Sequence, residues 1–386
     1  MSIKDLKTIG FGGMRSRALQ ITVGQTRSIR LSHNLKLRCF YESTFDEIAL
    51  QIINNKISET IKMTKRFHTI LGHLAIALIG LTSFASQAQT IPAGIPGRIE
   101  VHSLASTTLT TAEFLLGNAQ GKPVMLAGEL RLPVGAAAKF PAVILVHGSG
   151  GIGGAMDMWI HHLNQAGIAT FVVDTFSGRG IVSTVQDQTQ LDSLSMMVDA
   201  YKALELIAAH PRIDAKHIYV MGFSKGAVAS IFSASNRFKK MYGGQAQFAG
   251  HIGLYTPCNI RYIGDTDLTG APMRLFHGIT DDYVNIIPCR GFVEELKKKG
   301  VDVTLTEFPN SDHSYDGPLT PNRLEIPKAQ STRQCKFIED KPGNIVNAES
   351  KAVFSYTDPC IAVGAHVGYN AESTRQTIQA VISFIK

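Results

Sequence analysis

Short, unbroken apolar segments alternate with segments of helical periodicity over residues 142–308 of this 386-residue chain. Runs such as AVILV at 142–146 and IATFVV at 168–173 are typical of strands that are covered on both faces. Apolar residues at helical spacing lie between such strands, as at 191–209, before the strand at 217–221. This alternation predicts a mostly parallel sheet with helices on both faces. Loops that follow such strands meet at one edge, where ligands bind.

One long segment interrupts the alternation. Residues 317–364 are polar, contain five prolines and show little periodicity. They lie between the last expected strand, at 303–308, and a final helix expected at 372–385. A structureless loop of this length is unusual inside a domain unless it is functional or cross-linked. We therefore predict a disulfide-stapled insertion that could roof a pocket.

The net charge of +7 suggests a basic protein, but the excess is confined to the N-terminal part. Residues 1–88 hold 12 of the 38 basic and 5 of the 31 acidic side chains, which leaves 26 of each in residues 89–386. A nucleic-acid-binding domain needs a basic face. The balanced charge of residues 89–386 therefore predicts no nucleic-acid partner.

Residues 63–88 have the three parts of a signal peptide. MTKR at 63–66 is basic, residues 70–85 are mainly apolar, and SQA at 86–88 puts small residues before a cleavage site at Gln89. The apolar run is shorter than the roughly 20 residues of a spanning helix, and an uncleaved membrane anchor is the alternative. We predict export to the periplasm or the extracellular space, with no stable membrane anchor after cleavage.

A signal peptide should begin a protein, yet 62 residues precede this one. Residues 1–62 have a mixed composition and no periodicity that would make a domain. We predict that Met63 is the true start and that residues 1–62 are an upstream extension. Residues 89–386 then form the folded domain.

Four of the five cysteines lie in residues 89–386. An even number of cysteines in an exported chain suggests disulfides, with free buried thiols as the alternative. Cys258 and Cys289 follow successive strands on the same expected edge, and Cys335 and Cys360 both lie in the insertion. Of the three possible pairings, we predict Cys258–Cys289 and Cys335–Cys360.

The pattern G-x-S-x-G occurs at 222–226, between an apolar strand at 217–221 and a helix rich in small residues at 225–233. This is the context of the strained turn that carries the nucleophile of an α/β hydrolase. Its glycines allow strand and helix to approach closely, and the helix N-terminus favours developing negative charge. Ser224 is the predicted nucleophile, and an ordinary serine in a glycine-rich turn is the alternative.

In this fold the acid and then the histidine follow the nucleophile along the chain. Asp281 follows a buried strand, and its neighbour Asp282 is the alternative acid. His313 follows the next strand, whereas His366, the other histidine after Asp281, lies just before the last helix. We predict that His313 is the base that activates Ser224 and that Asp281 orients it.

Acyl transfer also needs backbone N–H groups that hold the oxyanion. Lys225, directly after the nucleophile, should supply one of them. The loop HGSGG at 147–151 follows the strand at 142–146 and should supply the other, from Ser149 with Gly150 next in order. The alternative for this loop is a tight strand-to-helix turn without a catalytic function.

Several segments together resemble the dienelactone hydrolase family of α/β hydrolases, with some likeness to catalytic domains of the prolyl-oligopeptidase type. They are HGSGG at 147–151, VVDTFSGRG at 172–180, HPRID at 210–214, YVMGFSKGA at 219–227, HGITDD at 277–282 and DHSYD at 312–316. The resemblance implies hydrolysis of a carboxylic ester or lactone through a covalent intermediate, without a cofactor. The namesake of the family is cytoplasmic and uses a cysteine nucleophile, so dienelactone itself is a poor expectation for the substrate.

Three further residues are candidates for substrate binding. Arg179 could hold a substrate carboxylate by a bidentate contact, or it could pair with Asp174. Phe176 and Tyr255 could line the pocket or pack in the core. No metal site stands out in the sequence.

The sequence thus predicts an exported serine hydrolase that acts on a small-molecule ester or lactone. A peptidase or acyl-amide hydrolase acting on short peptides would use the same triad. A non-catalytic binding protein that retains the fold is the third candidate.

Overall fold

The computed structural model describes residues 8–9, 19–23, 29–31 and 96–386, and the chain divides into two units, Met1–Ala88 and Gln89–Lys386. In the first unit, β1 (Thr8–Ile9), β2 (Leu19–Val23) and β3 (Ile29–Leu31) pair in this order as an antiparallel sheet. The predicted signal peptide and most of the predicted upstream extension lie outside the described residues, so both stay predictions. Within the described ranges, no helix combines the length and the apolar character needed to cross a membrane.

The second unit is built on an eight-stranded sheet with the order β12-β11-β9-β8-β6-β7-β5-β4. Its strands are β4 (Arg98–Thr108), β5 (Lys122–Leu132), β6 (Phe140–Val146), β7 (Ala169–Asp174), β8 (Ile213–Phe223), β9 (Gly250–Leu254), β11 (Met273–Gly278) and β12 (Val303–Phe308). The strands from β12 to β7 in this order run parallel, and β5 and β4 are antiparallel at the other end. The predicted mostly parallel sheet is confirmed.

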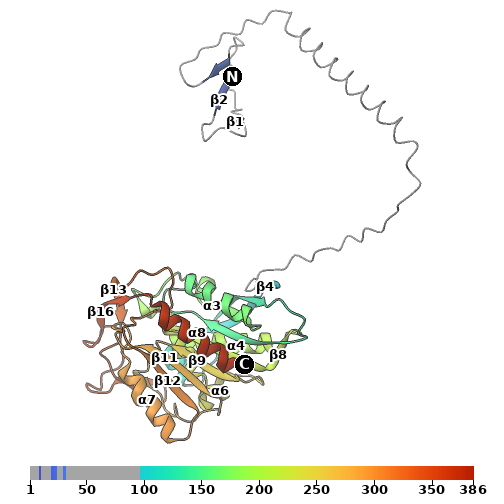
Figure 1. The fold of residues 1–386 in the computed structure, drawn as a ribbon. Coiled ribbons are helices and arrows are strands. Elements are labelled where there is room, and N and C mark those ends of the chain that lie inside the picture. The colour runs from blue at the N-terminus through green and yellow to red at the C-terminus, as the bar shows by residue number, and fades with distance from the viewer. Residues whose placement is uncertain (1–7, 10–18, 24–28, 32–95) are drawn as a thin grey trace, which may run out of the picture. The chain divides into compact units, whose positions relative to one another are not determined.

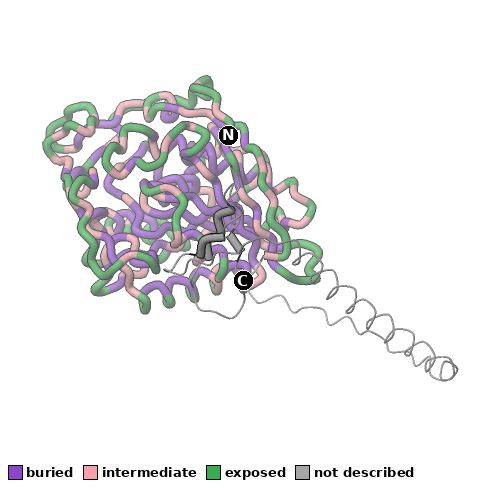
Figure 2. Tube along the Cα trace, turned by 90° about the horizontal axis from the view of Figure 1, so that it is seen from above, coloured by how far each residue is buried: buried purple, intermediate pink, exposed green. Residues whose placement is uncertain are grey.

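Helices pack on both faces of this sheet (Figure 1). They are α2 (Thr111–Leu115), α3 (Gly154–Gln165), α4 (Ser193–Ala208), α5 (Lys225–Phe232), α6 (Asn236–Tyr242), α7 (Ile287–Lys298) and α8 (Ala371–Ile385). Along β6, Ile144 packs in the core cluster that includes α4 and α5, whereas Leu145 packs in the cluster that includes α3 and α8. Both side chains are fully buried, and buried residues fill the centre of the unit in Figure 2. Because both faces are covered, the central strands are continuous apolar runs.

The segment 317–364 is not structureless, although its composition suggested so. It contributes β13 (Leu324–Ser331), which pairs with β16 (Ala362–Val367), and β14 (Phe337–Lys341), which pairs with β15 (Asn344–Asn347) and with β10 (Ile260–Arg261). These strands are short, and the β13–β16 register shifts between Ile326 and Gln330. A shift in register breaks the alternation of inward and outward side chains, which explains why the sequence shows little periodicity here.

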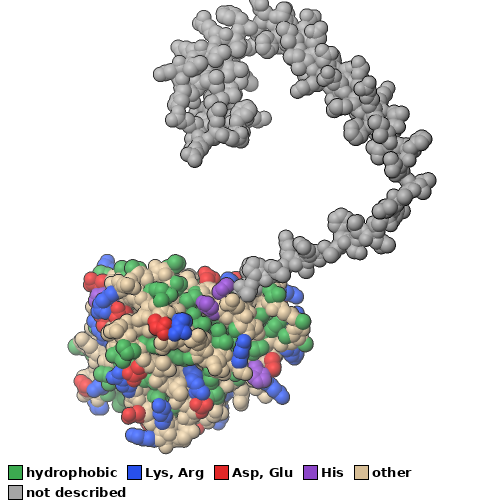
Figure 3. Space-filling view, viewed as in Figure 1, with side chains coloured by type: hydrophobic (Ala, Val, Ile, Leu, Met, Phe, Trp, Pro, Cys, Tyr) green, Lys and Arg blue, Asp and Glu red, His purple; other side chains and the backbone are tan. Residues whose placement is uncertain are grey.

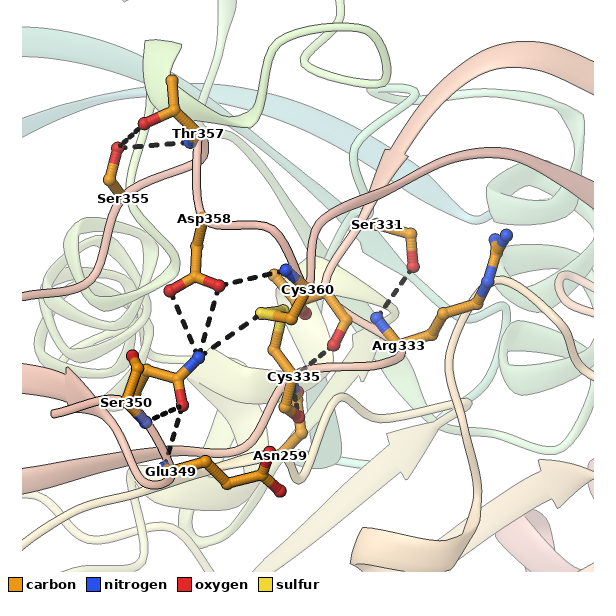
Figure 4. Close-up of a disulfide and its surroundings, with 12 residues drawn as sticks. Asn259, Ser331, Arg333, Cys335, Glu349, Ser350, Ser355, Thr357, Asp358 and Cys360 are labelled. Atoms are coloured by element: carbon orange, nitrogen blue, oxygen red, sulfur yellow. Dashed lines mark hydrogen bonds between the residues drawn. A yellow bond between two sulfur atoms is a disulfide. The ribbon is translucent and has the colours of Figure 1, made fainter. Parts of the chain in front are cut away.

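Both predicted disulfides, Cys258–Cys289 and Cys335–Cys360, are present. Figure 4 shows the second one and its surroundings. Beside it, the side-chain amide of Asn259 donates hydrogen bonds to the carbonyl oxygens of two residues of the insertion, one of them Cys335. The insertion is therefore tied to the segment after β9 by backbone pairing with β10 and by this amide, and it is closed on itself by a covalent bond.

The Cys335–Cys360 bond should contribute measurably to stability. It joins residues 25 apart, and a cross-link of this kind restricts the unfolded chain. We expect the double variant Cys335→Ser/Cys360→Ser to lose about 2–4 kcal/mol of unfolding free energy in urea titrations. Lys336→Ser, a change at the exposed neighbouring position, is the control. An unchanged denaturation midpoint in the double variant would show that the bond is dispensable.

Candidate active site

The turn at Ser224 joins β8 to α5 at the carboxyl edge of the sheet. Ser224 has φ 51° and ψ −116°, a conformation that a non-glycine residue adopts at a cost. Its N–H donates to the carbonyl oxygen of Leu254 at the end of β9, at 3.0 Å. A side chain on Gly222 would place its Cβ 2.1 Å from the carbonyl oxygen of Gly226. The tight turn therefore needs glycine at this position.

Gly226 is equally constrained, which gives a test of the turn. Alanine there would place a methyl group 2.2 Å from the carbonyl oxygen of Val146, so β6 or α5 would have to move. We expect Gly226→Ala to lose about 1–3 kcal/mol of unfolding free energy, and to lose activity because Ser224 moves with the turn. Gly291→Ala in α7 is the control, since a Cβ there meets nothing within 4 Å. A Gly226→Ala variant as stable as the wild type would contradict the close approach.

Three side chains that are far apart in the sequence meet beside this turn. The hydroxyl of Ser224 donates to Nε2 of His313, with 2.9 Å between the two atoms. Nδ1 of His313 in turn donates to Oδ2 of Asp281 at 2.8 Å. In such a chain a histidine can take the proton of a serine while an aspartate holds the imidazole in the required tautomer.

Asp281 is buried but keeps its negative charge. Its Oδ1 accepts hydrogen bonds from the N–H groups of Tyr283 and Val284 at 2.9 and 2.8 Å, and Nε2 of His277 lies 3.3 Å from Oδ2. Burial by itself raises the pKa of Asp281. The attraction of His313 and hydrogen bonds from both histidines outweigh burial, so the pKa lies below its usual value. A carboxylate is thus available to stabilise a charged imidazole.

Asp282, the alternative acid, faces a different histidine. Its carboxylate accepts hydrogen bonds from Nδ1 of His366 at 2.7 Å and from the backbone N–H of the same residue at 2.8 Å. Arg323 also lies 3.4 Å from it. The two neighbouring aspartates therefore serve different partners, and Asp281 is the one beside His313.

The imidazole of His313 lies between two tyrosine rings. The ring centroids of Tyr255 and Tyr283 are 4.6 and 4.8 Å from that of His313. Tyr255 is itself held by Asp316, a fully buried carboxylate that accepts hydrogen bonds from its hydroxyl at 2.9 Å and from Trp159 Nε1 at 2.7 Å. Sequence reasoning did not identify this support, because it depends on contacts between α3, β9 and the loop after β12.

The glycine-rich loop 147–151 runs beside Ser224. A Cβ on Gly148 would lie 3.3 Å from the Cβ of Ser224. His147 fixes the loop, since its Nδ1–H donates to the carbonyl oxygen of Gly148 at 2.8 Å and its Nε2 accepts from the N–H of Thr175 at 3.2 Å. Burial lowers the pKa of His147, which keeps the ring neutral and this tautomer in place.

The predicted oxyanion donors lie on either side of the serine. Ser149 and Gly150 belong to the glycine-rich loop, and Lys225 begins α5. Among the described residues, neither the N–H of Ser149 nor that of Lys225 donates to a backbone acceptor in a loop or turn. The assignment of these two N–H groups to an oxyanion hole stays a prediction.

Two cavities meet at Ser224, which we call the large and the small chamber. Their volumes are about 670 and 320 Å³, and both are lined by Ser149, Ser224 and Tyr283. The insertion lines both of them, for example with Tyr356 in the large chamber and Leu319 in the small one. The prediction that the insertion could roof a pocket thus agrees with where these residues lie.

Arg179 makes a different ion pair from the predicted one with Asp174. Its guanidinium donates to both carboxylate oxygens of Asp199 in α4, at 2.7 and 3.0 Å, and to the carbonyl oxygen of Thr175 at 2.7 Å. Asp174 instead accepts from the N–H of Phe176 at 3.0 Å. Arg179 is not among the residues that line either chamber. The N–H groups of its guanidinium bind oxygen atoms inside the protein, so Arg179 is not part of the site.

Of the other two candidates for substrate binding, only Tyr255 lines a chamber, the small one. Phe176 is buried and packs edge-on against His147, with 4.4 Å between the ring centroids. The structure thus places Phe176 behind the glycine-rich loop and Tyr255 beside the reacting groups.

The side chain of Lys225 reaches a residue that sequence reasoning missed. Its Nζ donates to the backbone carbonyl and to the side-chain oxygen of Gln188, both at 3.0 Å, at the start of the 3₁₀ helix η3 (Gln188–Gln190). The amide of Gln188 donates to the hydroxyl of Ser149 at 3.0 Å. Burial lowers the pKa of Lys225 to about 8. The available signal for Gln188 was its place in the loop after β7, at the edge where ligands bind.

The order of the sheet, the turn between β8 and α5 and the contact of serine, histidine and aspartate define the class of α/β hydrolases. The chain belongs to the Dienelactone hydrolase family, which matches residues 126–386. The resemblance seen in the sequence is thereby confirmed, and the protein is a hydrolase.

The sequence identity to an individual relative is low. A stretch of 154 residues is 27% identical to Dipeptidyl peptidase family member 1 of Caenorhabditis elegans, and it covers 35% of this chain and 18% of that protein. The chain thus spans less than a fifth of the length of this relative.

Two solved structures illustrate the structural likeness. One is a dienelactone hydrolase-like promiscuous phosphotriesterase from metagenomic libraries, with 16% identity, a TM-score of 0.48 and coverage of 75% of this chain and 98% of the other. The other is an esterase of the planctomycete Thermogutta terrifontis, with 18% identity, a TM-score of 0.39 and coverage of 49% and 79%.

Proposed function

We propose that this protein is an exported serine hydrolase that cleaves a carboxylic ester or lactone through an acyl-enzyme intermediate. The observation that carries this proposal is the hydrogen-bonded chain from Ser224 through His313 to Asp281. Membership of a family of hydrolases supports it. The substrate is a small molecule, and the chemistry described below uses no cofactor.

The reaction proceeds in two halves. His313 takes the proton of Ser224 as the hydroxyl oxygen attacks the carbonyl carbon, and Asp281 stabilises the charged imidazole. The N–H groups of Lys225 and Ser149 hold the oxyanion. His313 then protonates the leaving alcohol, and a water molecule repeats the sequence to release the acid.

Labelling with a fluorophosphonate probe tests this proposal directly. We expect one mole of probe per mole of protein, attached to Ser224, because only an activated serine reacts rapidly. Mass spectrometry of the labelled peptide locates the site, and His313→Ala serves as a folded but unreactive comparison. A protein that takes up no probe and hydrolyses no phenyl acetate would instead fit a non-catalytic binding protein that retains the fold.

A peptidase acting on short peptides is the second candidate, favoured by the partial likeness to a protein named dipeptidyl peptidase. The same three side chains can cleave an amide. Comparison of an ester and an anilide of the same acyl group separates the two functions. We expect the ester to be the better substrate by kcat/KM, and a preference for the anilide would favour the peptidase.

Export is supported by the two disulfides, which form in oxidising compartments. The mature protein should begin at Gln89, after removal of the signal peptide at 63–88. The intact mass of the protein from its native host measures this. Peptides from residues 1–62 in the expressed product would contradict the proposed upstream extension.

No nucleic-acid partner is proposed. Figure 3 shows Lys and Arg side chains interspersed with Asp and Glu over the face of residues 96–386 in view. The formal charges of residues 89–386 also balance, with 26 of each sign. A basic face that could bind phosphates is thus not supported by this view or by the composition.

A further inference from the structure

The position of His313 decides which half of an ester enters which chamber. His313 has to protonate the leaving alcohol oxygen, so this oxygen must lie next to Nε2. His313 is among the residues that line the small chamber and is not among those that line the large one. The alcohol half therefore enters the small chamber, and the acyl half, on the other side of the scissile bond, enters the large chamber.

The small chamber suits a small apolar alcohol. Its volume is about 320 Å³. Beside the reacting groups and the glycine-rich loop, it is lined mainly by apolar side chains, among them Met156, Phe223, Leu319 and Ile326, and it holds two further hydroxyl residues, Ser314 and Thr320. An alcohol with several hydroxyl groups would lose its contacts with water here and would find few hydrogen-bond partners, which costs free energy.

The large chamber is more polar than the small one. Most of its lining side chains carry hydroxyl or amide groups, among them Thr111, Gln188, Asn259, Gln330, Ser331 and Ser355. Tyr283 also lines it, and its phenol oxygen is buried without a hydrogen-bond partner in the described part of the chain. A buried hydroxyl in this state is costly unless a ligand completes it.

The charges of the large chamber balance. Lys225 and Lys122 line it on the positive side, and Glu113 and Asp192 on the negative side. An ammonium group has three N–H donors, and two of those of Lys225 go to Gln188. One donor of a side chain that is only 5% exposed is left for a ligand oxygen. Balanced charge with many donors and acceptors fits a neutral polyhydroxylated group better than an anion.

We propose that the substrate is an ester whose ester bond is not part of a ring. In this ester a polyhydroxylated acyl group of the sugar-acid type is joined to a small apolar alcohol. This inference rests on the ester hydrolysis proposed above. The oxygen of Ser224 replaces the alcohol oxygen on the carbonyl carbon, the alcohol leaves with the proton from His313, and water then releases the hydroxylated acid. A compact lactone suits this site less well, because its acyl and alcohol parts share one ring and cannot occupy separate chambers.

Two esters that exchange the position of the hydroxyl groups test the inference. In methyl galacturonate the acyl half is hydroxylated, whereas in 6-O-acetylgalactose the alcohol half is. We expect kcat/KM for methyl galacturonate to be at least 10-fold higher. An equal or reversed preference would overturn the assignment of the chambers. Phenyl acetate is the reference substrate: if it too is not hydrolysed and Ser224 takes up no fluorophosphonate, the ester hydrolase proposal itself fails.

Two substitutions in the large chamber test which side chains contact the acyl group. Lys225→Met keeps the backbone N–H and removes the ammonium, and Tyr283→Phe removes only the hydroxyl. We expect each to raise KM for methyl galacturonate several-fold more than KM for phenyl acetate. Lys139→Met, at an exposed position away from the site, is the control for Lys225→Met. Equal effects on both substrates would show that these side chains do not contact the acyl group.

Discussion

Ser224→Ala is expected to lower ester turnover by a factor on the order of 10⁴–10⁶. The variant keeps the backbone turn and loses the oxygen that attacks the substrate. The free energy of unfolding should change little, because within the described part of the chain the hydroxyl makes a single hydrogen bond, to His313, where the two chambers meet. Initial rates with phenyl acetate and urea denaturation measure the two quantities.

The control for this prediction is a serine outside the site. Ser103 lies on the exposed side of β4, and Ser103→Ala should retain wild-type turnover. Undiminished esterase activity in Ser224→Ala would show that another group is the nucleophile, even though the hydroxyl of Ser224 lies within hydrogen-bond distance of His313.

Asp281→Asn is expected to have the second largest effect, a fall in kcat of about 10⁴-fold. The amide can present N–H donors to His313 where the carboxylate accepts a hydrogen bond, which favours the wrong tautomer of the imidazole. It also removes the charge that the surrounding N–H groups of Tyr283 and Val284 hold in place. Steady-state kinetics with phenyl acetate measure the loss.

The neighbouring position supplies a matched control. Asp282→Asn changes the same chemical group one residue away, but Asp282 is paired with His366 rather than with His313. We expect this variant to stay within a few-fold of the wild type. If Asp282→Asn were the more damaging of the two changes, the acid of the proposed mechanism would have to be reassigned.

The central part of the sheet could be predicted from the sequence because burial on both faces leaves a clear pattern. The run 142–146 lies within β6 and the run 168–173 overlaps β7 almost entirely. The edge strand β4 was not predicted, since most of its first six residues are exposed and polar residues such as Ser103 are acceptable there. The strands of the insertion were missed for a related reason, because a shift of register breaks their pattern.

The meeting of three proposed catalytic side chains could be predicted because their order along the chain is constrained by the fold. The sequence selected Ser224, Asp281 and His313, and these three do lie within hydrogen-bond distance of one another in turn. The partner of Arg179 could not be predicted. Asp174 is close in sequence, but Asp199 reaches the guanidinium from α4, and only the packing of that helix brings the two together.

The covalent closure of residues 335–360 has a consequence for where the enzyme can be made. Under the proposals above, the reacting groups are carried by segments next to the sheet, whereas one part of the wall of the large chamber, formed by Ile345, Phe354, Ser355 and Tyr356, comes from this closed segment. Production in a reducing cytosol would therefore yield material that still splits simple esters but has become tolerant of unsuitable acids. A broadened substrate range in a recombinant preparation would then report on the oxidation state of the cysteines rather than on the native enzyme.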